Sequence, residues 1–220
     1  MEGKFSCADC YVKACRTKTE EKYPVFCPTR NLEPETLKEV MEEYADEETK
    51  AFARESALIE SDYYCKLTRV EETVEFIRRM GYHKIGVATC VGLLDEARTF
   101  TKILRAYGLD VYTVCCKCGA VDKTAIGVPE EKKLNKGSGH ESMCNPILQA
   151  KLLEQEGAEL NIMIGLCVGH DTLFLQHSAA PVTVLVVKDR VLCHNPVAAL
   201  YQANTGYSRF KDVLDPSGKP

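Results

Sequence analysis

The stretch KIGVATCVGLLDEARTFTKILRAYGLDVYTVC, residues 84–115, decides the fold. It opens with a short apolar run at 84–89, continues with apolar residues at helical spacing, and closes with a second run at 110–115. Gly108 predicts the end of the helix between the two runs. Two strands joined by a helix of this length predict a parallel pair with a right-handed crossover.

The same alternation continues toward the C-terminus. A helix predicted from Pro146 to Gly157 leads into NIMIGL at 161–166, and a short helix capped by Asp171 leads into VTVLVV at 182–187. Parallel sheets built in this way are covered by helices on both faces. The sequence therefore predicts an α/β fold with an open, mostly parallel sheet of four or more strands.

Three helices are expected before the first strand. Boundary residues mark them: Pro34 in a first turn, Asp46 and Thr68 as N-caps, and Gly81 as a stop. The predicted organisation is a cysteine-rich metal knuckle (1–33), a helical segment packed on the core (34–81) and a three-layer α/β domain (82–220). Its long loop at 117–143 is rich in Gly, Lys and Glu, and we interpret it as a lid over the sheet edge or an idle insertion.

Composition excludes several classes of function. The 220 residues are 45% hydrophobic and 27% charged, with a net charge of −4, so there is no basic surplus for nucleic acid. The longest uncharged apolar run, 179–187, is too short for a membrane span, and the N-terminus lacks a signal-peptide core. No glycine-rich nucleotide motif follows the first strand. We expect a cytoplasmic protein that binds neither nucleic acid nor membrane.

Twelve cysteines are unusual for a chain expected in a reducing compartment, where they indicate metal ligands or redox chemistry. Four of them, Cys7, Cys10, Cys15 and Cys27, lie close together near the N-terminus. Four thiolates select zinc or an iron–sulfur cluster, and a site filled entirely by protein ligands is structural. We favour zinc here, with an iron–sulfur cluster or no metal as the alternatives.

A second set of cysteines follows the predicted strands. Cys90 follows the first strand, Cys115, Cys116 and Cys118 follow the second, Cys144 precedes a crossover helix, and Cys167 follows the third strand. In a parallel sheet these positions meet at the edge formed by the carboxyl ends of the strands. A shared metal or cluster site, a reactive thiol without metal, and unconnected buried cysteines are the three interpretations.

Helix starts favour thiolates at this edge. CNP (144–146) and HNP (194–196) each predict an Asn cap followed by Pro at the first helical position. Helix N-termini lower thiol pKa values and stabilise anions. His170 is the nearest extra ligand or acid–base candidate, although it and His194 could simply bond to loop backbone. The segment 188–190 is interpreted as a solvated turn.

Four stretches resemble a known family: CADCYVKAC (7–15), CNPILQAKLL (144–153), GLCVGHDTLF (165–174) and TVLVVKDRVLCHNPVAALY (183–201). They are similar to uncharacterised microbial proteins labelled "metal-binding protein" (domain of unknown function, number eighteen forty-seven). The resemblance implies metal binding in a cytoplasmic protein of mostly anaerobic microbes, without an established reaction. It also implies family cysteines at the positions of Cys90, Cys144 and Cys167, and at either Cys116 or Cys118.

The leading hypothesis is a metalloprotein with a structural zinc knuckle and a second site at the sheet edge. The second site would hold a [4Fe–4S] cluster or a second zinc through Cys90, Cys144, Cys167 and either Cys116 or Cys118. A cluster implies a redox or sensing role, whereas zinc with an open position implies hydrolysis with His170 as proton carrier. A redox partner protein or a small anionic ligand would then be the partner.

Two other hypotheses belong to different classes. In the first, a metal-free enzyme uses Cys167 as nucleophile, His170 as base and Asp171 to orient it. In the second, the chain is a zinc-stabilised interaction module. The sequence does not decide whether the protein is an enzyme.

Overall fold

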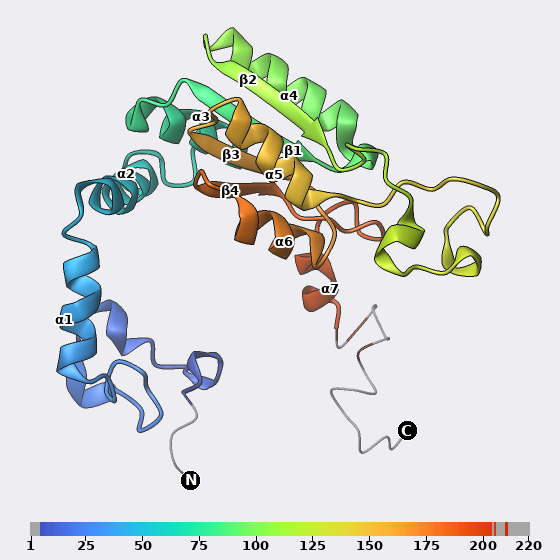
Figure 1. The fold of residues 1–220 in the computed structure, drawn as a ribbon. Helices are drawn as coiled ribbons and strands as arrows, with labels where there is room; N and C mark the ends of the chain where they lie inside the picture. Colours follow the sequence, from blue (N-terminus) through green and yellow to red (C-terminus); the bar gives the residue numbers. More distant parts are fainter. Residues whose placement is uncertain (1–4, 204, 206–209, 211–220) are drawn as a thin grey trace, which may run out of the picture. The chain divides into compact units, whose positions relative to one another are not determined.

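The structure, a computed structural model, describes residues 5–203, 205 and 210 (Figure 1). By its internal contacts the chain divides into two compact units, Met1–Leu58 and Ile59–Pro220. The second unit contains the sheet and is the larger of the two. Each unit is considered by itself.

The sheet has four strands, all parallel, in the order β2-β1-β3-β4. The strands are β1 (Lys84–Thr89), β2 (Asp110–Cys115), β3 (Leu160–Ile164) and β4 (Val182–Val186). The predicted α/β class is confirmed, and β1 and β2 span the predicted residues. Strands β1 and β3 lie in the centre and are almost entirely buried, which explains their continuous apolar runs.

Helices cover both faces of the sheet (Figure 1). The chain crosses from β1 to β2 through α4 (Leu94–Ala106), and returns across the sheet to β3 through α5 (Pro146–Gln155). Because right-handed crossovers in opposite directions use opposite faces, α4 and α5 lie on different sides. Helix α6 (His170–His177) follows the next crossover in the same direction as α5, so it lies on the same face of the sheet and packs against α5. Helix α3 (Arg69–Met80) lies on the face that α4 covers.

The core lies between these layers. Its largest fully buried side chains come from the two central strands and from the helices on both faces: Ile77, Ile85, Leu93, Leu104, Leu153, Leu160, Ile162, Ile164 and Phe174. A core of this kind fixes the strand ends rigidly. The carboxyl ends of β1, β2 and β3 are therefore a firm base for side chains that follow them.

Several local predictions are confirmed by hydrogen bonds. Thr68 and Glu71 form the capping box of α3, and Gly81 ends that helix with a positive φ of 70°. Asp46 accepts a hydrogen bond from the Thr49 amide (2.9 Å) before α2 (Glu47–Tyr63). Asn145 caps α5 through the Leu148 amide.

Two predicted caps are wrong. Asp171 lies inside α6, where its carboxylate accepts hydrogen bonds from the amides of Gly169 and Thr172, and Gly169 is the N-cap. The α7 helix (Val197–Tyr201) has Pro196 as its N-cap and no side-chain cap. Asn195 supplies only its backbone carbonyl to Ala198. The CNP and HNP motifs therefore form different local structures, because the second helix is too short to need a side-chain cap.

The N-terminal unit contains short 3₁₀ turns followed by helices. The turns are η1 (Cys7–Asp9), η2 (Ala14–Arg16) and η3 (Glu20–Lys22), and the helices are α1 (Pro34–Glu43) and the first part of α2. Its described residues are mostly exposed, with Ala14 and Cys27 as buried exceptions. This matches the expectation of a segment without its own apolar core; the metal knuckle itself stays a prediction.

Ion pairs between charged side chains hold the segment 117–143 together. It contains the 3₁₀ turns η5 (Lys123–Ile126) and η6 (Glu130–Lys132) and a bridge between Asp122 and Ser142. The buried Lys133 ammonium lies 2.8 Å from Asp122 and 2.9 Å from Glu130. Paired carboxylates are what permits a lysine to be buried. Its role as a lid stays a prediction.

Candidate functional site

Strand register brings Cys90 and Cys116 together. Thr89 at the end of β1 pairs with Cys115 at the end of β2, so Cys90 and Cys116 are the next pair. The Cys116 amide donates to the Thr89 carbonyl (2.8 Å), which extends the parallel pairing by one residue. Side chains alternate along a strand, so Cys115 and Cys116 point to opposite faces. Only Cys116 faces the same way as Cys90.

Cys116 is the centre of a three-thiol cluster. Its side chain interacts electrostatically with the thiols of both Cys144 and Cys90, and its Sγ accepts the Val91 amide at 3.3 Å. Cys116 and Cys90 are only 2% and 7% exposed, whereas Cys144 is partly exposed. We call Cys90, Cys116 and Cys144 the thiol cluster.

Two lysines lie beside the outer thiols of the cluster. The Lys117 ammonium lies 3.5 Å from the Cys144 sulfur and also donates to the Ser142 carbonyl (2.6 Å). Lys188 bonds to the Cys90 side chain. Each outer sulfur thus has a cation of its own, and a nearby cation favours a thiolate.

Arg190 links Cys167 to the cluster. Its guanidinium donates to the Cys167 sulfur at 3.0 Å, and its charge also acts on Cys90 and Cys144. These contacts raise the pKa of Arg190. The predicted site residues Cys90, Cys144 and Cys167 therefore lie around one guanidinium.

The three thiols of the cluster differ in the direction in which their pKa values are shifted. The Cys116 hydrogen bond, helped by the Gly92 amide and Lys188, lowers the pKa of Cys90. The same donor, with Lys117 and His170, lowers the pKa of Cys144. The pKa of Cys116 is raised, because its two thiol neighbours and its burial disfavour a charge there. The pKa of Cys116 is therefore shifted in the opposite direction from those of its two neighbours.

The contacts of Cys116 and Cys118 show which of the two belongs to the thiol cluster. Cys118 turns its sulfur toward the Asn145 carbonyl (3.8 Å), and burial raises its pKa. It has no hydrogen bond to the cluster among the described residues. Cys116 is thus the cysteine from this segment that joins Cys90 and Cys144.

The histidines do not form the predicted catalytic arrangement. His170 has its Nδ1 buried without a hydrogen-bond partner among the described residues, while Asp171 bonds to backbone amides. His170 instead helps to lower the pKa of the Cys144 thiol. His194 Nδ1 accepts the Asp189 amide (3.1 Å), which is the loop-backbone role considered for it.

Sequence reasoning missed the cations and one amide. The interpretation of residues 188–190 as a solvated turn agrees with the exposure of Arg190, but Arg190 donates to the Cys167 sulfur and Lys188 acts on Cys90. These residues follow β4 at the same edge as the cysteines, and this position was the available indication. The third missed residue, Gln149, is fully buried in α5. Its amide donates to the carbonyls of Thr89 (3.1 Å) and Val114 (2.7 Å), so one side chain joins α5 to the ends of β1 and β2.

The N-terminal cysteines have fewer described interactions with one another than the cysteines of the thiol cluster. Amides of Arg30 and Thr29 donate to Cys27 and lower its pKa. Tyr23 has its pKa raised by burial, by Glu20, and by Cys15 and Cys27 nearby. Cys15 and Tyr23 also line a cavity of about 830 Å³. Cys7 and Cys15 are exposed.

No preformed metal site is present within residues 5–203, 205 and 210: no three His, Cys, Asp or Glu side chains are already grouped to hold an ion. The donor chemistry of the thiol cluster nevertheless suits a soft metal, since its ligands would be thiolates. Cys90, Cys116, Cys144 and Cys167 would have to turn toward a common point to hold one.

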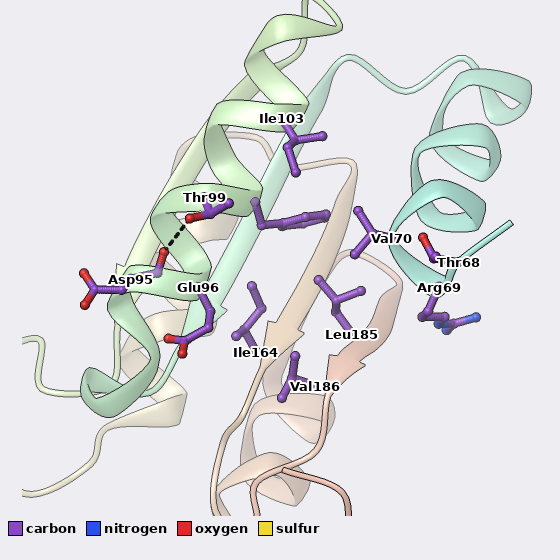
Figure 2. A pocket seen from close by; sticks show the side chains of 11 residues that line it. Thr68, Arg69, Val70, Asp95, Glu96, Thr99, Ile103, Ile164, Leu185 and Val186 are labelled. Carbon is purple, nitrogen blue, oxygen red and sulfur yellow. Dashed lines mark hydrogen bonds between the residues drawn. The ribbon is translucent and has the colours of Figure 1, made fainter. Parts of the chain in front are cut away.

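A separate apolar cavity of about 630 Å³ lies between α3 and α4 (Figure 2). Val70, Ile103 and Leu185 project into it, and Glu96 lies at one end. No cysteine lines it. It is therefore distinct from the thiol cluster.

Fold and site together define an α/β protein with an open parallel sheet and a cysteine-rich carboxyl edge. The chain belongs to the family described as "Protein of unknown function (DUF1847)", which matches residues 27–185. It is 44% identical over 197 residues to "Uncharacterized protein MJ0455" of Methanocaldococcus jannaschii, covering 90% of this chain and 94% of that protein. None of the described helices is long and apolar enough to cross a membrane.

Proposed function

We propose that the carboxyl edge of the sheet binds a soft metal centre, with Cys90, Cys116, Cys144 and Cys167 as the ligands. The observation that carries the proposal is that backbone hydrogen bonds place Cys116 beside the segments of Cys90 and Cys144, with whose thiols its side chain interacts. Arg190 donates to the Cys167 sulfur, and its charge also acts on Cys90 and Cys144. Thiolates gathered in this way select zinc or an iron–sulfur cluster.

Nearby charge suits a cluster with a redox or sensing role. Four thiolates around a dipositive centre leave about two negative charges, and Lys117, Lys188 and Arg190 supply three positive ones nearby. Surrounding cations favour addition of an electron to a centre. A zinc ion with the same four thiolates would carry the same charge, but it has no redox chemistry for the cations to influence.

The N-terminal cysteines Cys7, Cys10, Cys15 and Cys27 are proposed as a structural zinc site. Support comes from the scarcity of buried apolar residues in this unit and from the amide hydrogen bonds to Cys27. A short segment without a core folds when metal binding supplies its folding free energy. Cys10→Ser should release one metal equivalent from the chain while the sheet unit stays folded. Unchanged metal content in that variant contradicts the knuckle.

The decisive experiment is metal analysis of protein purified without oxygen, combined with its visible absorption spectrum. An iron–sulfur cluster gives a brown protein with iron and sulfide, whereas zinc gives a colourless one. Cys116→Ser should remove the metal of the sheet edge. Cys118→Ser is the matched control, because Cys118 is two residues away and bonds only to Asn145 in the described structure. Full metal content in Cys116→Ser contradicts the proposal.

A metal-free nucleophile at Cys167 is the second candidate. The specific observation in its favour is the Arg190 guanidinium, which donates a hydrogen bond to the Cys167 sulfur at 3.0 Å. The proposed base is less well supported, since His170 Nδ1 has no hydrogen-bond partner in the described part of the chain. Rapid alkylation of Cys167 in metal-free protein, lost in Arg190→Gln, would favour this candidate over the metal centre.

A further inference from the structure

Cys116 and Cys144 differ in their access to solvent although they lie in neighbouring, hydrogen-bonded segments. Cys116 is 2% exposed, lies directly after β2 and is covered by its neighbours. Cys144 is partly exposed and lies in the chain just before α5. A small oxidant in water therefore reaches Cys144 first, and Cys116 lies in the neighbouring segment.

Backbone hydrogen bonding holds the two segments side by side. The Asn145 amide donates to the Cys116 carbonyl at 2.8 Å, directly beside both cysteines. Disulfides need Cα atoms within about 4.4–6.8 Å of each other, the spacing of neighbouring hydrogen-bonded chains. The disulfide then requires the two side chains to rotate toward each other.

Lys117 fixes the environment of the Cys144 sulfur. Its ammonium lies 3.5 Å from that sulfur and is anchored on the Ser142 carbonyl at 2.6 Å. A fixed cation at this distance can hold a peroxide against the sulfur and stabilise the hydroxide that leaves it. Neither Cys118, which is directed at Asn145, nor the more deeply buried Cys90 combines access with such a cation.

We propose that Cys144 and Cys116 form a reversible oxidation site for hydrogen peroxide or another small hydroperoxide, with Cys144 as the reactive thiol and Cys116 as the resolving thiol. The Cys144 thiolate attacks the peroxide, an S–O bond forms, the O–O bond breaks, and the hydroxide that leaves takes up a proton from solvent to give one water. Cys116 then attacks the sulfenic sulfur, the S–S bond forms and the S–O bond breaks, releasing a second water. The dithiol loses two electrons and one peroxide is reduced to two waters.

The disulfide itself does not depend on metal binding. The effect of the disulfide on metal binding does rest on the proposed function, because the disulfide would consume two of the four proposed ligands. Oxidation would then release the metal of the sheet edge, so that metal content reports the presence of peroxide.

The test uses the full chain as isolated, with its metal content measured before and after treatment with one equivalent of hydrogen peroxide. Remaining thiols are alkylated and disulfides are mapped by mass spectrometry. The expected product is a Cys116–Cys144 disulfide that a dithiol reductant reverses. In Cys116→Ser, a sulfenic-acid trap should label Cys144 and this disulfide should be absent. Cys118→Ser should behave like the unmodified chain.

A Cys90–Cys116 disulfide as the main product, or an unreactive Cys144, would overturn the proposal. So would direct conversion of Cys144 to sulfinic acid in the chain that keeps Cys116. Circular dichroism before treatment shows whether Cys116→Ser is folded, and Lys117→Gln gives a second variant, expected to slow the oxidation of Cys144 at least tenfold. If the disulfide forms in a chain that holds no metal at the sheet edge, the oxidation site stands and the metal centre fails.

Discussion

The two ends of the parallel sheet are held by different chemistry. At the amino end, the Glu159 carboxylate accepts the amides of His83 and Lys84 (both 2.7 Å), and Asn161 donates to the Ser178 hydroxyl (2.8 Å). At the carboxyl end, thiols and cations take the place of these ordinary polar links. Each end has one fully buried amide side chain, Asn161 or Gln149, whose oxygen has no partner among the described residues.

We infer from this difference that the amino end of the sheet contributes to stability and the carboxyl end to function. The polar groups named at the amino end hold backbone and side chains by ordinary hydrogen bonds, so we expect changes there to alter the free energy of unfolding alone. The carboxyl end concentrates groups that can bind or react. Changes there should alter thiol chemistry even where they cost the same stability. Paired substitutions at the two ends test this directly.

The largest effects are expected from a pair of glycines. A Cβ at Gly165, near the carboxyl end, would lie 1.9 Å from Leu93 Cδ1, and its φ is +67°. A Cβ at Gly86 would lie 1.9 Å from Asn161 Oδ1. Overpacking of this kind, with the added backbone strain at Gly165, should lower the free energy of unfolding by roughly 2–4 kcal/mol in both alanine variants. Urea denaturation measures this.

Only one of the two glycine variants should disturb the thiol cluster. Leu93 follows Cys90 closely, and the Leu93 amide bonds to the Cys90 carbonyl (2.9 Å), so a displaced Leu93 moves Cys90. Gly165→Ala should therefore change the rate at which Cys90 and Cys144 are alkylated in the folded protein, and Gly86→Ala should not. Adding Leu93→Ala to Gly165→Ala relieves the clash. Equal alkylation changes in the two single variants would refute the separation.

Much of the fold could be predicted from the sequence because its determinants are local. The run at 84–89 has the apolar continuity of a doubly covered strand, and Thr68, Gly81 and Asn145 have the types that caps and stops require. Asp171 was misassigned because Asp serves equally well inside the first turn of a helix. Gly169, with its positive φ, took the cap position instead.

The site could be predicted only in part because its details depend on register and on long side chains. Strand ends placed Cys90, Cys144 and Cys167 at one edge, but choosing Cys116 over Cys118 requires the face on which each lies. Arg190 reaches its cysteine across the sheet edge from another strand, and no local pattern distinguishes it from a solvated arginine.

The next largest effect is expected for the two buried amides. Gln149→Met and Asn161→Leu each replace an amide with an apolar side chain of similar shape. Each should cost about 1–2 kcal/mol, since hydrogen bonds are lost while one unpartnered oxygen is removed. Gln149→Met also frees the start of α5 from the ends of β1 and β2, so it should reduce the yield of the Cys116–Cys144 disulfide. Disulfide mapping after peroxide treatment compares the two variants. A lower yield in Asn161→Leu alone would contradict the assignment of roles.

The smallest effect should come from the Glu159 carboxylate and should depend on pH. Hydrogen bonds from the Lys84 and His83 amides lower the pKa of Glu159 below the value of about 4.3 expected in the unfolded chain. A lowered folded-state pKa contributes stability that is present above the unfolded pKa and is lost as pH falls through the folded one. Because Glu159 is exposed, we expect Glu159→Gln to cost only about 0.5 kcal/mol at pH 7. The difference should vanish in acid while thiol alkylation at pH 7 stays unchanged. Urea titrations at neutral and acid pH measure it, and a cost independent of pH would mean that carboxylate charge does not strengthen this end of the sheet.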